Sequence, residues 1–193
     1  MKNIENKYMA LHSPGGCGTI LFWSWVSERY NNRITPQTAV HHINVISIGN
    51  DNVNVVYLYG DPVDCVLSFY RRHKIKDSNF NTAHCRHLMI PPVTLTLDEY
   101  IENGKDLFQL ERFFDNHVNM RNSIAIKYED MWENLDEILG HLGLGAHINE
   151  FPEYKERSVH PIKNNPEKYN KLKEIYSGLY DKMSKIPSVY YIN

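Results

Sequence analysis

Apolar residues occur in short runs that alternate with longer stretches of helical periodicity. Runs rich in β-branched and aromatic residues predict strands at 8–12, 52–60 and 123–130, and residues 34–49 predict one or two more after Pro36. The nearly continuous apolar run at 55–59 is typical of a strand buried on both faces of a parallel sheet. Helices are predicted at 19–30, 62–74, 97–104, 106–119, 135–142 and 166–186, and residues 77–92 are expected to form an irregular excursion. This order predicts an α/β fold of three layers, with a mostly parallel sheet flanked by helices.

The turn between the first strand and the first helix has the features of an anion-binding loop. Gly15, Gly16 and Gly18 would let the backbone approach phosphate oxygens, and Thr19 adds a hydroxyl at the start of the helix. A nucleoside triphosphatase loop carries a lysine after its last glycine, and this loop has none. The alternative is a glycine-rich turn that binds no ligand.

The second predicted helix has a well-marked start. Asp61 stands at the N-cap position, Pro62 at the first helical position and Asp64 in the first turn. These residue types satisfy the amides of the first turn and oppose the positive end of the helix dipole. The helix is therefore expected to begin at Pro62, directly after the strand at 52–60.

Composition limits the classes of partner. The chain has 193 residues, which suits a single domain over 1–193, and its net charge of −2 provides no general attraction for nucleic acid or anionic membranes. Three cysteines, Cys17, Cys65 and Cys85, do not form a disulfide framework, which indicates a reducing compartment. Residues 1–12 lack an apolar signal core, and no stretch is long enough to span a bilayer. We expect a soluble cytoplasmic protein that binds neither nucleic acid nor membrane, with any anion site built locally.

Three stretches, in the same order, resemble the sulfotransferase family. Residues 55–70, VVYLYGDPVDCVLSFY, resemble its 3′-phosphate-binding motif, in which a strand ends in Arg-Asp/Asn-Pro-x-Asp and a serine follows. The matching residues of that motif are Asp61, Pro62, Asp64 and Ser68. Gly18, Thr19 and Trp23 fall in the region of the family's Lys-x-Gly-Thr loop and aromatic helix. Tyr128, Glu129 and Asp130, followed by Leu142, Gly143 and Leu144, match its Tyr-Glu-Asp-Leu and Leu-Gly-Leu elements.

The resemblance implies a P-loop-like fold and a donor, 3′-phosphoadenosine 5′-phosphosulfate (PAPS), whose product is adenosine 3′,5′-bisphosphate (PAP). It implies that Gly15, Gly16, Cys17, Gly18 and Thr19 hold the 5′-phosphosulfate. It further implies that Ser68 binds the 3′-phosphate and that Tyr128 lies near the adenine, with no metal required. The acceptor would be a hydroxyl or amine on a small molecule, carbohydrate or protein, and His42 or His41 would be its base.

Two family cations are missing from this chain. The family lysine aligns with Gly16 and the family arginine with Gly60, and the C-terminal Arg-x-Gly-x-x-Gly segment is also absent. Preorganised charge is often the largest catalytic contribution, so its loss places the transfer reaction in question. Nearby replacements are Arg72, which we assign to the cofactor site, and Arg71 beside it. Further basic residues near the motifs are His12, His73, Lys74 and Lys127.

Other functions remain open at this stage. A protein of the same fold could retain the anion pocket after losing catalysis. A nucleotide kinase without the loop lysine would use Asp61 to hold magnesium. His84, Cys85 and His87 are zinc-ligand types, although one short cluster is a weak signal. Cys17 at a helix N-terminus could be a reactive thiol, as in a Cys-His hydrolase.

Overall fold

The structure, a computed structural model, describes residues 8–29, 40–41, 53–75, 80–120, 123–156 and 159–192. Within them a five-stranded sheet has the order β2-β1-β3-β4-β5. The strands are β1 (Tyr8–His12), β2 (Val40–His41), β3 (Val53–Tyr59), β4 (Ser123–Lys127) and β5 (Val189–Ile192). β2, β1, β3 and β4 are parallel to one another, and β5 is antiparallel to β4. This confirms an α/β fold with a mostly parallel sheet.

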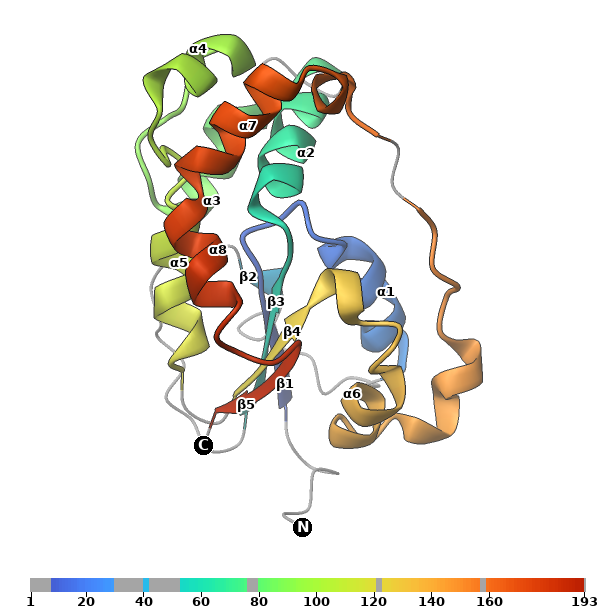
Figure 1. Cartoon of the computed structure of the whole chain (residues 1–193). Coiled ribbons are helices and arrows are strands. Elements are labelled where there is room, and N and C mark those ends of the chain that lie inside the picture. The colour runs from blue at the N-terminus through green and yellow to red at the C-terminus, as the bar shows by residue number, and fades with distance from the viewer. Residues whose placement is uncertain are drawn as a thin grey trace.

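Helices cover both faces of this sheet. The helices are α1 (Thr19–Arg29), α2 (Pro62–Ile75), α3 (Phe80–Leu88), α4 (Leu97–Asn103), α5 (Leu110–Val118), α6 (Leu135–His141), α7 (Pro166–Ile175) and α8 (Ser177–Met183). Three short 3-10 helices are η3 (Tyr128–Asp130), η4 (Gly145–Glu150) and η5 (Pro161–Asn164). Figure 1 shows α1 and α6 against one face, and α5 and α8 against the other. Figure 1 also shows residues 151–156, in orange, leading away from η4 along one side of the molecule.

The strand order creates a crevice at the carboxyl edge of the sheet. From β1 the chain continues to β2 on one side, whereas from β3 it continues to β4 on the other. Ligands in open α/β sheets bind at such a point, where the strand order reverses. The loop after β1 and the start of α2 after β3 are therefore placed side by side.

Local signals correctly predicted the start of α2 and the burial of β3. The Asp64 amide donates to Asp61 Oδ1 at 2.9 Å, and α2 begins at Pro62 as expected. Residues 55–59 of β3 are each at most 3% exposed. Residues 56–59 belong to the main hydrophobic core, and Val55 forms a small second cluster with Ala10 and Met120.

The prediction of an irregular excursion at 77–92 is wrong, since Phe80–Leu88 forms α3. Its buried positions include Asn81 and His84, polar residues that obscured the helical pattern. The His84 ring packs 4.4 Å from the Phe69 ring and stacks on Phe80 at 5.7 Å. Ring packing by His84 thus helps to bury the inner face of α3, a role that aliphatic side chains usually have in a helix.

The prediction of one helix over 166–186 is also wrong, because the chain breaks at Tyr176 between α7 and α8. The Tyr176 side chain is buried, and its hydroxyl donates to Asp106 Oδ1 at 3.2 Å and pairs with the Tyr100 hydroxyl. These tertiary hydrogen bonds hold Tyr176 at a backbone angle φ of −106°, outside the helical range. The short strand β5, which follows α8, was not predicted.

In the part of the chain that the structure describes, no helix combines the length and the apolar character needed to cross a bilayer.

Candidate functional site

A cavity of about 750 Å³ lies at the carboxyl edge of the sheet. Its wall comes from the loop after β1, from α2, from η3 after β4, from four residues between η4 and η5 (154, 156, 159 and 160), and from η5 itself. The segments that follow the parallel strands β1, β3 and β4 thus all contribute to the wall of this cavity. The volume is within the range of sites that bind small molecules and cofactors.

Five of the predicted ligand-binding residues line this cavity. They are Gly16, Gly18, Ser68, Arg72 and Tyr128. They follow three different strands, β1, β3 and β4, so only the fold brings them together. The glycine loop and Ser68 therefore share one cavity.

The other predicted loop residues do not line the cavity. Ser13 Oγ accepts the Gly15 amide at 3.0 Å and lies 2.7 Å from Thr19 Oγ1. Cys17 Sγ donates to the Leu58 carbonyl at 3.4 Å. Gly15, Cys17 and Thr19 are buried and maintain the shape of the loop. Their assignment to the cofactor stays a prediction.

Cys17 is poorly placed to act as a nucleophile. Burial by itself would raise the pKa of its thiol, but hydrogen bonds with Cys65, Ser13 and Thr19 outweigh burial and lower the pKa. Its side chain is nevertheless fully buried, so a substrate cannot contact the sulfur. A lowered pKa therefore has no reactive consequence in this conformation.

The predicted bases are not tested by the geometry. His41 ends the short strand β2, beside β1, and His42 lies outside the described residues. Their assignment as the base stays a prediction.

The positions of the two missing family cations are occupied by other groups. A Cβ on Gly16 would lie 2.8 Å from the Cys65 Cα, and Gly16 has a φ of +78°. A Cβ on Gly60 would lie 2.9 Å from both Cys17 Cβ and Glu129 Oε1. Glu129 Oε1 also accepts the Asp61 amide at 3.0 Å. Neither position has room for a side chain pointing along its Cα–Cβ bond.

Tyr128 packs directly on the loop. A Cβ on Gly18 would lie 1.9 Å from the ring carbon Cε2 of Tyr128, so only glycine allows the ring to lie there. The other side of the ring meets Trp132 edge-on, with centroids 5.2 Å apart. Tyr128 is thereby held at the junction between the loop and the cavity.

Charges of both signs line the cavity. Its described wall has the cations Arg71, Arg72 and Lys163 and the carboxylates Asp64, Glu129 and Glu156. Because these formal charges cancel, the electrostatic potential in the cavity depends on which of the charged groups form ion pairs with each other. Lys163 Nζ lies 2.7 Å from Asp64 Oδ1, and the Arg72 guanidinium lies 5.9 Å from the centre of the Phe80 ring.

Sequence analysis missed Lys163 and its neighbour His160. Lys163 belongs to η5 and His160 directly precedes it, in a stretch without a family-like motif. The one local signal is Pro161 at the start of η5, where His160 Nδ1 accepts the Ile162 amide at 3.2 Å. This cap predicts a turn, and it carries no information about the cavity.

Two other basic residues considered as replacements do not line the cavity. His12 is buried, with Nδ1 3.1 Å from His117 Nε2. His117 Nδ1 lies 2.7 Å from the Phe113 carbonyl, which can only accept, so this nitrogen carries a proton. Lys127 Nζ forms an ion pair with Asp130 at 3.0 Å.

The residue types considered for metal binding have structural partners. His84 Nε2 donates to the Pro14 carbonyl at 2.8 Å, while Cys85 is buried and His87 is exposed on α3. Both Asp61 carboxylate oxygens are engaged, one by the Asp64 amide and the other by the Tyr180 hydroxyl at 2.8 Å. Within the described ranges, no group of three or more His, Cys, Asp or Glu side chains is arranged to hold a metal ion.

The arrangement suits an elongated anionic ligand. The N-terminus of α1 adjoins Gly16 and Gly18 at one part of the wall, and a hydroxyl and guanidinium groups from α2 lie at another. Such a wall offers both main-chain and side-chain donors to phosphate-like groups. The chain matches no protein-family model, no curated protein and no solved structure.

Proposed function

We propose that the chain is a sulfotransferase-like protein that binds PAPS in this cavity and transfers its sulfuryl group to a hydroxyl or amine. The acceptor would belong to a small molecule, carbohydrate or protein. The observation that carries the proposal is the shared cavity, which Gly16 and Gly18 line together with Ser68 and Arg72. Gly16, Gly18 and Ser68 belong to two stretches that resemble the family and lie far apart in the sequence, and Arg72 follows one turn after Ser68.

The wall has a suitable partner for each part of the donor. The loop and the N-terminus of α1 would hold the 5′-phosphosulfate through main-chain amides. Ser68 and Arg72, one turn apart on α2, would hold the 3′-phosphate. Tyr128 would contact the adenine, because its ring lies between the loop and the cavity.

The proposed chemistry is an in-line displacement at sulfur. The acceptor oxygen or nitrogen forms a bond to sulfur while the bond from sulfur to the bridging oxygen breaks, and PAP leaves. The acceptor proton passes to a base, for which His42 and His41 remain the predicted residues. No step of this transfer requires a metal ion.

A second function, binding without transfer, is favoured by one observation. The backbone of Cys65 closes the position of the family lysine at Gly16, so the loop has no cation of its own. One preorganised donor to a developing charge typically contributes about a hundred- to a thousandfold in rate. A protein without that donor would hold the nucleotide and transfer its sulfuryl group slowly or not at all.

Calorimetric titration of the purified chain distinguishes these functions. Binding of PAP without metal supports the nucleotide site, whereas binding only of ATP with magnesium supports the kinase alternative. Labelled sulfate transfer from PAPS to a panel of phenols, amines and carbohydrates then separates the transferase from the binding protein. Failure to bind PAP overturns the proposal.

Replacement of the Ser68 hydroxyl is expected to weaken PAP binding. Ser68→Ala removes one hydrogen bond to a charged phosphate, so the dissociation constant should rise about ten- to a hundredfold. Calorimetry measures the change, and Ser184→Ala, which removes a hydroxyl from an exposed residue after α8, is the control. An unchanged affinity in Ser68→Ala would remove Ser68 from the phosphate site.

A further inference from the structure

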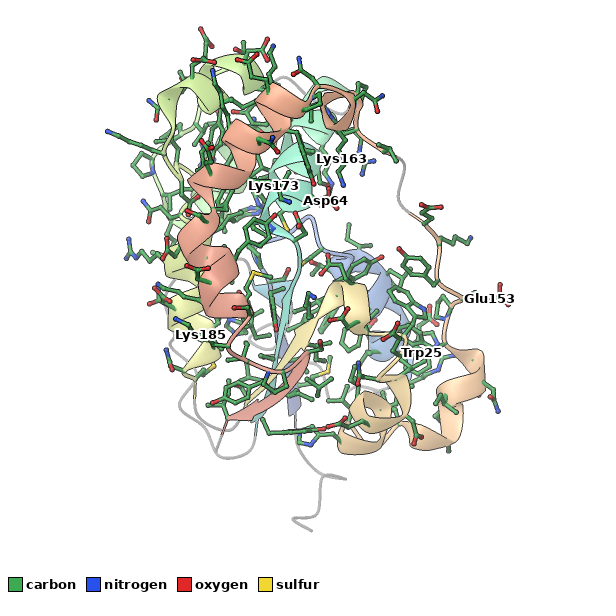
Figure 2. The ribbon with its side chains drawn as sticks, viewed as in Figure 1. Trp25, Asp64, Glu153, Lys163, Lys173 and Lys185 are labelled. Atoms are coloured by element: carbon green, nitrogen blue, oxygen red, sulfur yellow. The ribbon has the colours of Figure 1, made fainter. Side chains whose placement is uncertain are left out.

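Lys163 reaches the cavity from the C-terminal part of the chain. It belongs to η5, whose first turn is held by Pro161 and by the His160 cap. Its ammonium lies 2.7 Å from Asp64 Oδ1, in the first turn of α2. Figure 2 shows Lys163 and Asp64 next to each other, contributed by η5 and α2. Among the described residues, Lys163 is the one lysine on the cavity wall.

This ion pair lies beside the loop that lacks a lysine. Asp64 directly precedes Cys65, whose Cα would be 2.8 Å from a Cβ on Gly16. Asp64, Lys163 and Gly16 all line the same cavity. The fold therefore brings an ammonium group to the cavity that the loop without a lysine also lines.

We infer that Lys163 is the cation that binds the phosphosulfate or phosphate end of the ligand, and that Asp64 holds it in place when no anion is bound. The inference rests on the proposed function for the identity of the ligand, and on the geometry of the cavity for the rest. An ammonium has three donors, so Lys163 can contact a phosphate oxygen while it keeps or exchanges its bond to Asp64. The residue would replace, from another segment, the charge that the loop has lost.

The electrostatics of the pair agree with this role. Burial by itself would lower the pKa of Lys163, but the hydrogen bond and the charge of Asp64 outweigh burial and raise the pKa, so Lys163 is charged at neutral pH. The side chains of Lys163 and Asp64 are 31% and 25% exposed, so an incoming anion can reach the pair. Asp64 also repels that anion and competes with it for the ammonium.

The opposite charges of the two residues predict opposite effects on PAP binding. Lys163→Met should weaken PAP binding about ten- to a hundredfold, the range of a charge-assisted hydrogen bond. Asp64→Asn should strengthen it about threefold or more, because it removes the competing charge. In a Lys163→Met background the Asp64→Asn gain should largely disappear, since no ammonium is left to release. Calorimetric titration of the four proteins measures this cycle.

The chain offers a matched control pair away from the cavity. Lys168 Nζ and Asp98 Oδ1 also lie 2.7 Å apart, and neither residue lines the cavity. Lys168→Met and Asp98→Asn should leave PAP affinity unchanged. All the variants should unfold within about 4 °C of the wild type, since partly exposed ion pairs add little stability. Glu156→Gln, another carboxylate of the wall, measures the general effect of removing a negative charge.

The outcomes separate this inference from the proposed function. If the wild type binds PAP and Lys163→Met binds it equally well, the role of Lys163 is overturned. If the Asp64→Asn gain persists without Lys163 and equals that of Glu156→Gln, the holding role of Asp64 is overturned. If the wild type binds inorganic pyrophosphate but not PAP, the nucleotide proposal fails, and the effect of Lys163→Met on pyrophosphate decides the inference. Binding of neither anion overturns both.

Discussion

A lysine introduced at position 16 is expected to destabilise the protein by about 2 to 5 kcal/mol instead of restoring a catalytic cation. Gly16 has a φ of +78°, which costs a residue with a side chain about 1 to 2 kcal/mol. Its Cβ would also lie 2.8 Å from the Cα of Cys65, and backbone atoms cannot rotate away as a side chain can. Forcing the two segments apart adds about 1 to 3 kcal/mol.

Urea unfolding of Gly16→Lys and Gly16→Ala measures this cost. The matched control is Gly104, which has a similar φ of +67° but no atom within 4 Å of a Cβ. Gly104→Ala should lose only the backbone contribution, about 1 to 2 kcal/mol. If Gly16→Ala is no more destabilised than Gly104→Ala, the contact with Cys65 is not a barrier. A lysine on the loop would then be structurally possible.

The second large effect is expected from Asp61→Ala, which should lower the free energy of unfolding by about 2 to 3 kcal/mol. Asp61 Oδ1 caps α2 through the Asp64 amide, and Oδ2 accepts the Tyr180 hydroxyl of α8. Loss of an N-cap costs about 1 kcal/mol or somewhat more, and the unpaired tyrosine hydroxyl adds about 1 kcal/mol. The single carboxylate thus connects the start of α2 to the C-terminal helices.

Two further variants separate these contributions in the same urea experiment. Asp61→Asn keeps a capping oxygen and an amide that can pair with the tyrosine, so most of the stability should remain. Tyr180→Phe removes only the second hydrogen bond and should cost about 1 kcal/mol. Equal losses in Asp61→Ala and Asp61→Asn would show that the negative charge matters more than the cap.

The elements that were correctly predicted depend on residues close together in the chain. β1 and β3 are short apolar runs, and α2 starts at a local sequence of Asp61, Pro62 and Asp64. The elements that were missed depend on distant contacts. α3 is stabilised by rings packed against Phe69 of α2, and the helix break at Tyr176 by hydrogen bonds to Tyr100 and Asp106. Periodicity cannot report either contact.

The residues of the candidate site also differ in how far the sequence predicted their positions. Motif positions placed Gly16, Gly18, Ser68 and Tyr128 in one site, and its position near the second motif added Arg72. All five line one cavity. Gly15, Cys17 and Thr19 came from the same loop motif, yet their side chains and amides engage one another or the core. A sequence motif identifies the loop. Which of its amides and side chains face the cavity depends on the path of the backbone.

By itself, the sequence determined the strand segments β1 and β3, the glycine turn and the capped start of α2, because each depends on neighbours within a few residues. Only the tertiary structure decided which charges meet in the cavity. Cys65 leaves no room for a side chain at Gly16, and Cys17 and Glu129 leave none at Gly60. Lys163, from the C-terminal part of the chain, forms an ion pair with Asp64. The physical reason is that steric closure and ion pairing act through space, between segments whose separation along the chain carries no signal of their contact.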